Sequence, residues 1–401
     1  MPNYSGVWSL PTQMQAIADQ NWPMGPGAPT AVSASAGDAQ AAVTFTAPSF
    51  TGVPPGITGY LATSNPGGLT ATGASSPLTV TGLTNGVSYT FDVQATNGVQ
   101  YGPAGTSGSV SPAAPRAVFG GGLTTGGSRT NIMDYIDMST TGNATDFGDL
   151  IASVENNSSC ASSTRGIFFG GNDGGDNQTI NYITIITTGN ASDFGNLDPT
   201  ATDGAACSNE TRGIIGGTGG VVASYITIAS TGNSATFGNL TGSPNISQLG
   251  ACASTTRGVF AGGLRGSTSN IIDYVTIDTT GNATDFGDLI STTRSLSGAS
   301  NSTRGVFGGG GSFGSGNVIQ YITIASTGNA TDFGDMLANT GGLGAAASST
   351  RITFGGGTSG SYSNVIQYIT ISSTGNAIDF GDLTAPRAEL SACSNGHGGL
   401  S

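Results

Sequence analysis

The sequence predicts an almost all-β protein, and three observations lead to that prediction. Apolar residues come in short, regularly spaced runs that are rich in β-branched and aromatic side chains, as in YITIAS and YVTIDT. No stretch beyond about residue 20 has the length and period of a helix. One ten-residue segment, TGNATDFGDL in its first copy at 141–150, recurs six times with small changes, which indicates a repeated structural unit.

The composition excludes several classes of partner. Only 8 % of the residues are charged, the net charge is −13, and Lys is absent, so that all ten positive residues are Arg. Such a chain lacks the basic patch that nucleic acids and anionic membrane surfaces require. No run of about 20 apolar residues is present, so no membrane span is expected. The start MPNYSGVWSL lacks the features of an export signal, so we expect synthesis in the cytoplasm and exposure only as part of a particle.

Residues 1–26 form the first predicted segment. The stretch LPTQMQAIADQ could make two or three helical turns, with Pro11 near the start, but it is too short to fold alone. Exposed Trp is costly without a use, which favours a docking peptide that buries its apolar side chains in a partner. The candidate docking residues are Trp8, Leu10, Met14 and Trp22. A frayed terminus is the alternative.

Residues 27–113 predict a small antiparallel β-sandwich. Alternating runs such as AAVTFTAP and VSYTFDVQATN are separated by turn signals such as PPG and NPGG. The segment GLTNGVSYTFDVQATN at 82–97 resembles the fibronectin type III domain, with Leu83 and Tyr89 at the positions of that family's tyrosine corner. Phe45 stands where many members carry a core Trp. The resemblance implies a spacer or adhesion module without catalysis.

Residues 114–401 contain six repeats of about 47 residues. Each repeat has a Tyr and a Phe spaced by 12 residues, and each carries one Arg at the same point, which we call the template Arg. The template Arg residues are Arg116, Arg165, Arg212, Arg257, Arg304 and Arg351. Four predicted strands in each of six repeats are typical of a six-bladed β-propeller. The diglycine Gly308–Gly309 followed by Tyr321 and Phe333 resembles a kelch blade, with Phe in place of the usual outer Trp.

The two ends of the repeat array complement each other. The first repeat opens at Arg116 directly on a glycine-ended strand, so it lacks an innermost strand. The C-terminal ELSACSNGHGGL at 389–400 aligns with the innermost strands, since CSNGHGG matches CSNETRG at 207–213. We therefore expect the C-terminal strand to complete the first blade and close a six-bladed ring, which leaves no unpaired strand edge there.

Within the repeated segment, TGN is predicted to form the tight turn between the third and fourth strands, because Gly and Asn tolerate positive φ. The Phe that follows is expected in the core. The residues before it in four copies are Asp146, Asp285, Asp332 and Asp379. We expect these Asp residues to pair with the template Arg of a neighbouring blade, with Thr236 as an exception in the third copy.

The loops on one predicted face differ strongly between repeats, whereas those on the other face agree. Loops that differ are the usual place of recognition. Candidate ligand contacts are Arg129, Asp173, Asp176, Arg265, Phe313 and Tyr362. Solvated loop residues without a function are the alternative for this set. The segment NDGGDN at 172–177 offers oxygen ligands for weak Ca²⁺ binding, but a solvated loop is expected there, and no metal site is predicted.

The four cysteines occupy one column of the repeat alignment. They are Cys160, Cys207, Cys252 and Cys393, and Ala299 and Ala346 fill the column in the other repeats. Small residues suit a tightly packed innermost strand, and equivalent positions on different blades rarely meet the geometry of a disulfide. We expect free, buried thiols.

Catalysis and cofactors are not expected. A copper oxidase of the propeller type would need two His, and the chain has one, His397. The repeated segment also lacks the Asp-box pattern of sialidases, and no nucleophile elbow is present.

The opening SGVWSLPTQMQAIADQNWP is similar to the starts of structural proteins from marine tailed bacteriophages. That resemblance implies a virion protein whose partners are other virion proteins. We expect a non-enzymatic phage appendage, a tail fibre or tail-associated protein, that presents the propeller to a host surface glycan or protein. A capsid decoration or head fibre without a receptor and a cellular surface adhesin are the alternatives. Homo-oligomerisation stays open.

Overall fold

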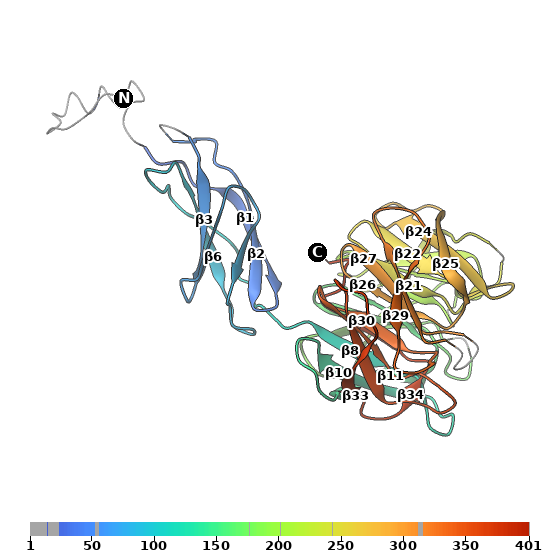
Figure 1. Cartoon of the computed structure of the whole chain (residues 1–401). Coiled ribbons are helices and arrows are strands. Elements are labelled where there is room, and N and C mark those ends of the chain that lie inside the picture. Colours follow the sequence, from blue (N-terminus) through green and yellow to red (C-terminus); the bar gives the residue numbers. More distant parts are fainter. Residues whose placement is uncertain are drawn as a thin grey trace. The chain divides into compact units, whose positions relative to one another are not determined.

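The structure is a computed structural model that describes residue 14 and residues 24–52, 56–175, 177–200, 202–242, 244–311 and 316–400 (Figure 1). All elements named in these residues are β-strands, which confirms the all-β prediction for the described part. The expected helix near residues 10–20 lies outside the described residues, apart from Met14. The chain divides into two compact units, Met1–Ala114 and Pro115–Ser401. No described helix is long and apolar enough to cross a membrane.

The described part of the first unit consists of two antiparallel sheets, ordered β1-β2-β5 and β4-β3-β6-β7. Their strands are β1 (Thr30–Gly37), β2 (Gln40–Thr46), β3 (Gly59–Asn65), β4 (Thr70–Gly73), β5 (Leu78–Thr81), β6 (Thr90–Thr96) and β7 (Gly105–Thr106). Alternate residues of β2, β3 and β6 are buried, as expected when one face of each strand packs on a core. The hydroxyl of Tyr89 accepts a hydrogen bond from the Thr84 amide at 3.1 Å, and Phe45 packs on Tyr60 with ring centroids 4.6 Å apart.

The second unit contains six four-stranded antiparallel sheets, which we number 1 to 6 in chain order. Sheet 1 has β35 (Ser391–Ser394), β8 (Arg116–Gly120), β10 (Thr130–Asp137) and β11 (Thr145–Val154); sheet 2 has β12 (Ser158–Ala161), β13 (Arg165–Phe169), β14 (Thr179–Thr184) and β15 (Ser192–Asn196); sheet 3 has β16 (Ala205–Ser208), β17 (Arg212–Gly216), β18 (Val222–Thr227) and β19 (Ala235–Asn239). Sheet 4 has β21 (Gly250–Ala253), β22 (Arg257–Ala261), β24 (Ser269–Thr276) and β25 (Thr284–Thr293); sheet 5 has β26 (Ser297–Ser300), β27 (Arg304–Gly308), β28 (Val318–Thr323) and β29 (Thr331–Asp335); sheet 6 has β30 (Gly344–Ala347), β31 (Arg351–Gly355), β32 (Val365–Thr370) and β33 (Ile378–Asp382). Two short pairs lie in the loops: β9 (Leu123–Thr124) with β34 (Arg387–Ala388), and β20 (Ile246–Ser247) with β23 (Leu264–Arg265).

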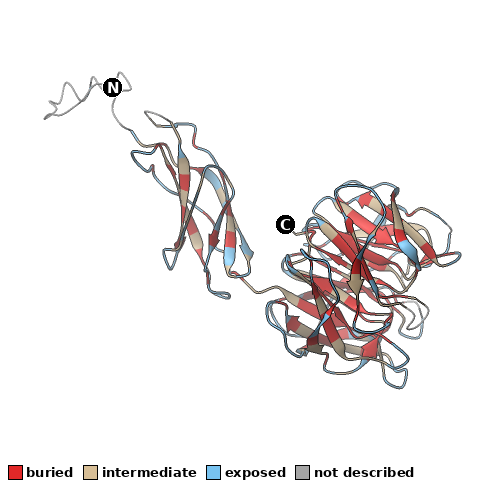
Figure 2. Cartoon of the chain, in the orientation of Figure 1, coloured by how far each residue is buried: buried red, intermediate tan, exposed pale blue. Residues whose placement is uncertain are grey.

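The first strand of each sheet is called its inner strand here, because these six strands contact one another. Contacts run from β12 to β16, β21, β26, β30 and β35 in that order, and β35 also contacts β12. The C-terminal strand β35 pairs with β8 in sheet 1, with Cys393 opposite Val118, so the predicted pairing of the two ends of the array is confirmed. Buried residues follow the strands of these sheets, and exposed residues follow the connecting loops (Figure 2).

The TGN segment does not form the hairpin turn, which corrects the prediction. In sheet 2 the turn lies just before the TGN segment, where the Thr187 amide bonds to the Thr184 carbonyl. The segment instead runs along the outermost strand of the preceding sheet: the Gly189 amide bonds to the Phe147 carbonyl, and the Ala191 amide to the Asp149 carbonyl, each at 2.8 Å. No Asn of the six copies has a positive φ.

The Asn side chain of the segment completes this connection, which we call the latch. In sheet 2, Asn190 Oδ1 accepts a hydrogen bond from the Asp149 amide at 3.1 Å. The equivalent side chains that accept such a bond are Asn233, Asn282, Asn329, Asn376 and Asn143. In the last case Asn143 of sheet 1 receives the amide of Asp382 in sheet 6, although the two residues lie 239 positions apart. Latches therefore join each sheet to the next and sheet 6 to sheet 1.

The latch also explains the Gly after the repeated Phe. A Cβ on Gly238 would lie 2.0 Å from the Gly281 carbonyl oxygen of the next sheet, and one on Gly148 would lie 2.5 Å from the Gly189 oxygen. No side chain fits at such a distance, so the backbones of two sheets meet only where this residue is Gly.

The template Arg residues bond to carbonyl oxygens and not to the predicted Asp residues. Arg116 Nη1 donates to the Ile185 carbonyl of sheet 2 at 3.1 Å, and its guanidinium lies 4.2 Å from the Tyr135 ring centroid. The other five repeat both contacts, each with the next sheet's carbonyl and its own sheet's Tyr. The predicted Asp partners are exposed. A guanidinium that stacks on an aromatic ring directs its donors along the ring plane, here toward the neighbouring backbone.

The four cysteines are free and buried, as predicted, and their positions follow from packing between sheets. A Cβ on Gly305 of sheet 5 would lie 2.6 Å from the Cys252 sulfur of sheet 4, and the same relation holds for Gly166, Gly213 and Gly258 with Cys393, Cys160 and Cys207. Where the column has Ala, the partner is larger: Ala346 shares a core with Ala117, and Ala299 with Ile352. Burial raises the pKa of the Cys160 thiol to about 12, so it stays protonated.

Prediction for the latch: Gly238→Ala should lower the free energy of unfolding by about 2–3 kcal/mol, because the new methyl overlaps the Gly281 carbonyl. The control is Gly281→Ala on the other side of the same contact, where a Cβ would meet nothing within 4 Å. Calorimetry of the full chain measures both. Equal effects of the two substitutions would contradict the close approach.

Prediction for the cysteine column: Gly305→Ala should cost about 1–3 kcal/mol, because its methyl overlaps the Cys252 sulfur. Cys252→Ala in the same chain should recover much of that loss, since the pair then matches the Ala346 and Ala117 combination. A double-mutant cycle by denaturant unfolding measures the coupling, expected at about 1 kcal/mol or more. If the two substitutions changed the free energy of unfolding additively, this explanation would be wrong.

Candidate functional site

A cavity of 130 Å³ lies at one end of the six inner strands, and we call it the inner-strand cavity. Residues from the start of every inner strand and from the loop before it line this space. The second residue of each inner strand contributes a small side chain or none: Ser159, Ala206, Ala251, Gly298, Ala345 and Ala392. The inner strands lie close together, so space for the cavity remains only because these six positions carry small side chains or none.

The rim of the cavity is formed by six residues that we call the rim residues. They are Asn156, Asp203, Gln248, Ser295, Gly342 and Glu389. Each has a left-handed backbone, with φ between 55° and 66°. The amide of each bonds to the carbonyl of the rim residue in the preceding sheet, in the order 203 to 156, 248 to 203, 295 to 248, 342 to 295, 389 to 342 and 156 to 389. Because these bonds occupy backbone amides and carbonyls of the rim, the rim side chains are the groups available for contacts in the cavity.

Three carboxyl groups gather on one side of this rim. Burial, a hydrogen bond with Glu155 and the charges of Glu155 and Asp203 together raise the pKa of Glu389 to about 7, and burial has the largest effect. Burial, followed by the charge of Glu155, also raises the pKa of Asp203. Two carboxyl groups share a hydrogen bond only when one of them holds a proton, so this side of the rim stores a proton near neutral pH.

Arg129 approaches this carboxyl group cluster from outside the cavity. Its guanidinium lies 2.7 Å from a Glu155 carboxylate oxygen, and its side chain is 34 % exposed. The predicted contact residue is therefore partly committed to an ion pair. It still presents part of its surface to solvent beside the rim.

The other described loop candidates are spread over different sheets and do not line the cavity. Asp173 is exposed and accepts hydrogen bonds from the Asn177 side chain at 3.1 Å and from the Gly175 amide at 3.3 Å, which orders its own loop. Tyr362 is half-buried and forms a β-bridge with Thr358.

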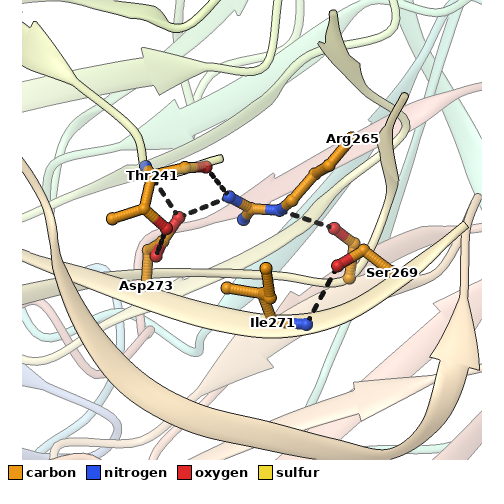
Figure 3. Close-up of polar contacts among 6 residues, drawn as sticks. Thr241, Arg265, Ser269, Ile271 and Asp273 are labelled. Atoms are coloured by element: carbon orange, nitrogen blue, oxygen red, sulfur yellow. Dashed lines mark hydrogen bonds and ion pairs between the residues drawn. The ribbon is translucent and has the colours of Figure 1, made fainter. Parts of the chain in front are cut away.

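Arg265 is buried, and the expectation that it reaches toward a ligand is wrong. Its guanidinium lies 2.7 Å from the Asp273 carboxylate, and both side chains are almost completely shielded from solvent. Figure 3 shows the guanidinium directed at Asp273 and at the Thr241 carbonyl, with Thr241 also bonded to Asp273 through its hydroxyl. The cluster joins the loop of sheet 4 to the end of sheet 3, so Arg265 holds two sheets together.

A second buried pair has the same form at the junction of sheets 6 and 1. Arg387 lies 2.6 Å from Asp134, and the Thr384 hydroxyl donates to the same carboxylate. Asp134 and Asp273 each precede the repeated Tyr of their sheets. In three other sheets this position is an amide residue that accepts a backbone hydrogen bond from the preceding sheet: Asn181, Gln320 and Gln367. The position therefore serves the junctions between sheets.

Several predicted site residues fall outside the described residues. They are Trp8, Leu10, Trp22, Asp176 and Phe313. Met14, the remaining docking candidate, is 65 % exposed.

Sequence reasoning missed the rim residues and the carboxyl cluster. The signal was present, because five of the six rim residues lie nine positions before a template Arg, although no two of those five are the same amino acid. A search for repeated residue types overlooks a column that keeps its position and changes its identity. His397, at the far end of the inner strands, was weighed only as a catalytic group. It is half-buried beside a second cavity of 50 Å³, with Nε2 2.8 Å from the Ala161 carbonyl oxygen.

Prediction for the rim: Glu389→Gln should stabilise the protein above pH 7 and flatten its stability profile below it. The native Glu389 pKa of about 7 exceeds its ordinary value, so the native state binds the extra proton, and stability rises as pH falls from above 7 toward 4.5. Because this carboxyl is partly solvated, the expected change is about 1 kcal/mol. Unfolding at several pH values measures it, with exposed Asp146→Asn as control; an unchanged profile in Glu389→Gln would be the contrary result.

Comparison with known proteins adds no family to this geometry. A scan against protein-family models finds no match, and a search of the curated proteins finds none. Among the described residues, no group of three or more His, Cys, Asp or Glu side chains is arranged to hold a metal ion.

Proposed function

We propose that residues 114–401 form a closed six-bladed β-propeller, with sheets 1 to 6 as its blades and β35 as the strand that closes the ring. Three series of contacts support this proposal, because each passes through all six sheets and returns to its start. They are the contacts between inner strands, the latches, and the bonds from each template Arg to the next sheet. A kelch-like blade is supported by the glycine-ended second strand and the Tyr–Phe pair, whose rings meet edge to face in each sheet.

The first unit is proposed to be a fibronectin type III-like sandwich over residues 27–113. The division into a three-stranded and a four-stranded sheet supports this, as does the hydrogen bond of the Tyr89 hydroxyl to the backbone five residues upstream. Such a unit serves as a spacer between an attachment point and a binding domain. Residues 1–26 are proposed as the docking peptide.

The proposed function is that of a non-enzymatic bacteriophage virion appendage, a tail fibre or tail-associated protein, that presents the propeller to a host surface glycan or protein. The observation that supports it is a contrast within the second unit between uniform junctions and differing loops. Junctions between sheets use the same backbone and side-chain bonds six times, whereas the loops at the rim end differ in length and sequence. A rigid frame with unlike loops is the arrangement of a binding scaffold.

The virion assignment rests on the similarity of the opening segment to structural proteins of marine tailed bacteriophages. Other virion proteins are the proposed partners of this segment, with the virion as the final location. The experiments below test this proposal against two alternatives. One is a capsid decoration or head fibre, and the other is a cellular surface adhesin.

Prediction for the virion role: deletion of residues 1–23, which contain all four candidate docking residues, should abolish incorporation into particles and leave folding unchanged. Residues 24–26 are kept, because Pro26 is buried and the Asn97 side chain donates a hydrogen bond to the Met24 carbonyl. Immunodetection of the protein in purified virions measures incorporation, and calorimetry of the purified chain controls for folding. Normal incorporation of the shortened chain would contradict the docking role. Loss of folding would place residues 1–23 inside the fold, which also contradicts it.

The receptor role is tested separately with the labelled full chain and host cells. Saturable binding that a rim-loop exchange between two sheets removes supports the appendage function. Absence of binding, together with incorporation that depends on residues 1–23, would identify a decoration protein.

A further inference from the structure

We propose that residues 395–400 form an acid-released plug, which closes one mouth of the ring of inner strands and is held there by the neutral side chain of His397. These residues follow β35, and we call them the plug. The proposal is independent of the virion role, because every contact that carries it lies within the second unit.

The plug lies at the end of the inner strands opposite the rim. The second cavity, of 50 Å³, is found there, and it is lined by His397 and by the third and fourth residues of all six inner strands. The second residue of each inner strand lines both cavities, so the two spaces adjoin at that ring of small residues. None of the described lining residues is Asp, Glu or Arg, so the plug covers a mouth without carboxylates or guanidinium groups.

Contacts of the plug cross this mouth from one sheet to another. The Gly398 amide donates a hydrogen bond to the Ser300 carbonyl of sheet 5 at 2.7 Å, and His397 Nε2 lies 2.8 Å from the Ala161 carbonyl oxygen of sheet 2. A Cβ on Gly398 or on Gly399 would overlap backbone atoms of sheet 5 or sheet 3. Only glycine fits at these two positions, so the backbone of the plug lies directly against the ends of the sheets.

His397 uses its two ring nitrogens in a way that only the neutral ring permits. Nε2 must carry a hydrogen to bond to the Ala161 carbonyl, and Nδ1 must be bare to accept the hydrogen bond of the Gly399 amide at 3.1 Å. A second proton, on Nδ1, would set two N–H donors against each other and place a charge in a half-buried site. Protonation of the ring therefore breaks the bond that closes the turn from residue 397 to residue 399.

Burial lowers the pKa of His397, in agreement with this geometry, while the hydrogen bond to Ala161 and the charge of Glu210 act in the opposite direction. Glu210 lies in the loop of sheet 3 and accepts hydrogen bonds from the amide and hydroxyl of Ser163 in sheet 2 at 2.9 Å and 2.7 Å. Its carboxylate favours the charged ring and so limits the change in pKa.

The other titratable side chains around the plug are thiols and guanidinium groups. Burial raises the pKa of all four thiols in this cavity, so they stay protonated as the pH falls. The template Arg residues of the surrounding sheets each donate to a carbonyl oxygen of a neighbouring sheet: Arg116, Arg165, Arg212, Arg304 and Arg351. Mild acid therefore acts on the plug through His397.

The direction of the pH effect follows from linkage. In the seated plug the pKa of His397 lies below its ordinary value of 6.5, and in the released plug the ring recovers that value. Seating is thus unaffected well above pH 6.5. As the pH falls below it, the equilibrium shifts toward release by up to about tenfold for each pH unit, until the seated ring itself takes a proton.

Two measurements on the full chain between pH 8 and pH 5 test the proposal. His397 is the only His of the chain, so histidine-selective NMR reads its tautomer and pKa directly. We expect hydrogen on Nε2 at pH 8 and a pKa below 6.5. Hydrogen exchange of the Gly398 and Gly399 amides, corrected for the intrinsic effect of pH, should accelerate at least about tenfold from pH 7 to pH 5, while amides of the second strands keep their protection.

Three variants separate the switch from a structural role of the ring. His397→Gln keeps a donor for the Ala161 carbonyl and cannot take a proton, so exchange at Gly398 should lose its pH dependence. Glu210→Gln should lower the pKa of His397 further, because it removes the carboxylate that favours the charged ring. Glu389→Gln changes a carboxyl at the opposite end of the inner strands and should leave the response of the plug unaltered.

Several outcomes would overturn the proposal. Corrected exchange rates at Gly398 and Gly399 that stay constant from pH 8 to pH 5 would show that acid does not release the plug. A response of His397→Gln equal to that of the unchanged chain would exclude the ring as the cause. A His397 pKa at or above 6.5 would mean that the seated plug accepts the proton. Loss of protection in the second strands at the same pH would identify general acid unfolding in place of a local release.

Discussion

The backbone contact between the end of one sheet and the TGN segment of the next is the constraint on which the second unit depends. Each latch combines two main-chain hydrogen bonds with one from an Asn side chain, and it needs a Gly where the two chains meet. Hydrogen bonds of this kind are specific in direction and distance. They fix how each sheet sits on its neighbour, and apolar packing alone would allow sliding. Six equal junctions bring sheet 6 back to sheet 1, where Asn143 meets the Asp382 amide.

Other features of the sheets follow from the same geometry. Once neighbouring sheets are held this closely, the residues between them must be complementary in size, so a Cys on one inner strand faces a Gly on the next sheet. The template Arg stacks on its own Tyr and bonds to the next sheet's backbone. The inner strands lie so close to one another that only small side chains fit along their shared cavity. Freedom remains in the loops and rim, which is where the proposed binding chemistry lies.

The sequence predicted a large part of this arrangement. Periodicity located the strands of the repeats, the unequal ends of the array predicted the pairing of β35 with β8, and the Cys column predicted free, buried thiols. The prediction that TGN forms a turn was wrong. Gly and Asn are typical of turns, and nothing in the local sequence indicates that this extended segment contacts another sheet. Arg265 was wrong for a related reason: a long polar side chain in a variable loop is expected in solvent, and only its burial beside Asp273 shows otherwise.

The sequence by itself determined the strand content, the six-fold repeat and the pairing of the chain ends, because these depend on local periodicity and on counting. The tertiary structure decided which sheet each repeated residue serves. A latch Asn, a template Arg and a rim residue all act on the neighbouring sheet, about 40 or more residues away along the chain, and no local pattern contains that contact. The carboxyl cluster is the clearest case, since Glu155, Asp203 and Glu389 come from three separate loops and acquire their shared proton only where the inner strands converge.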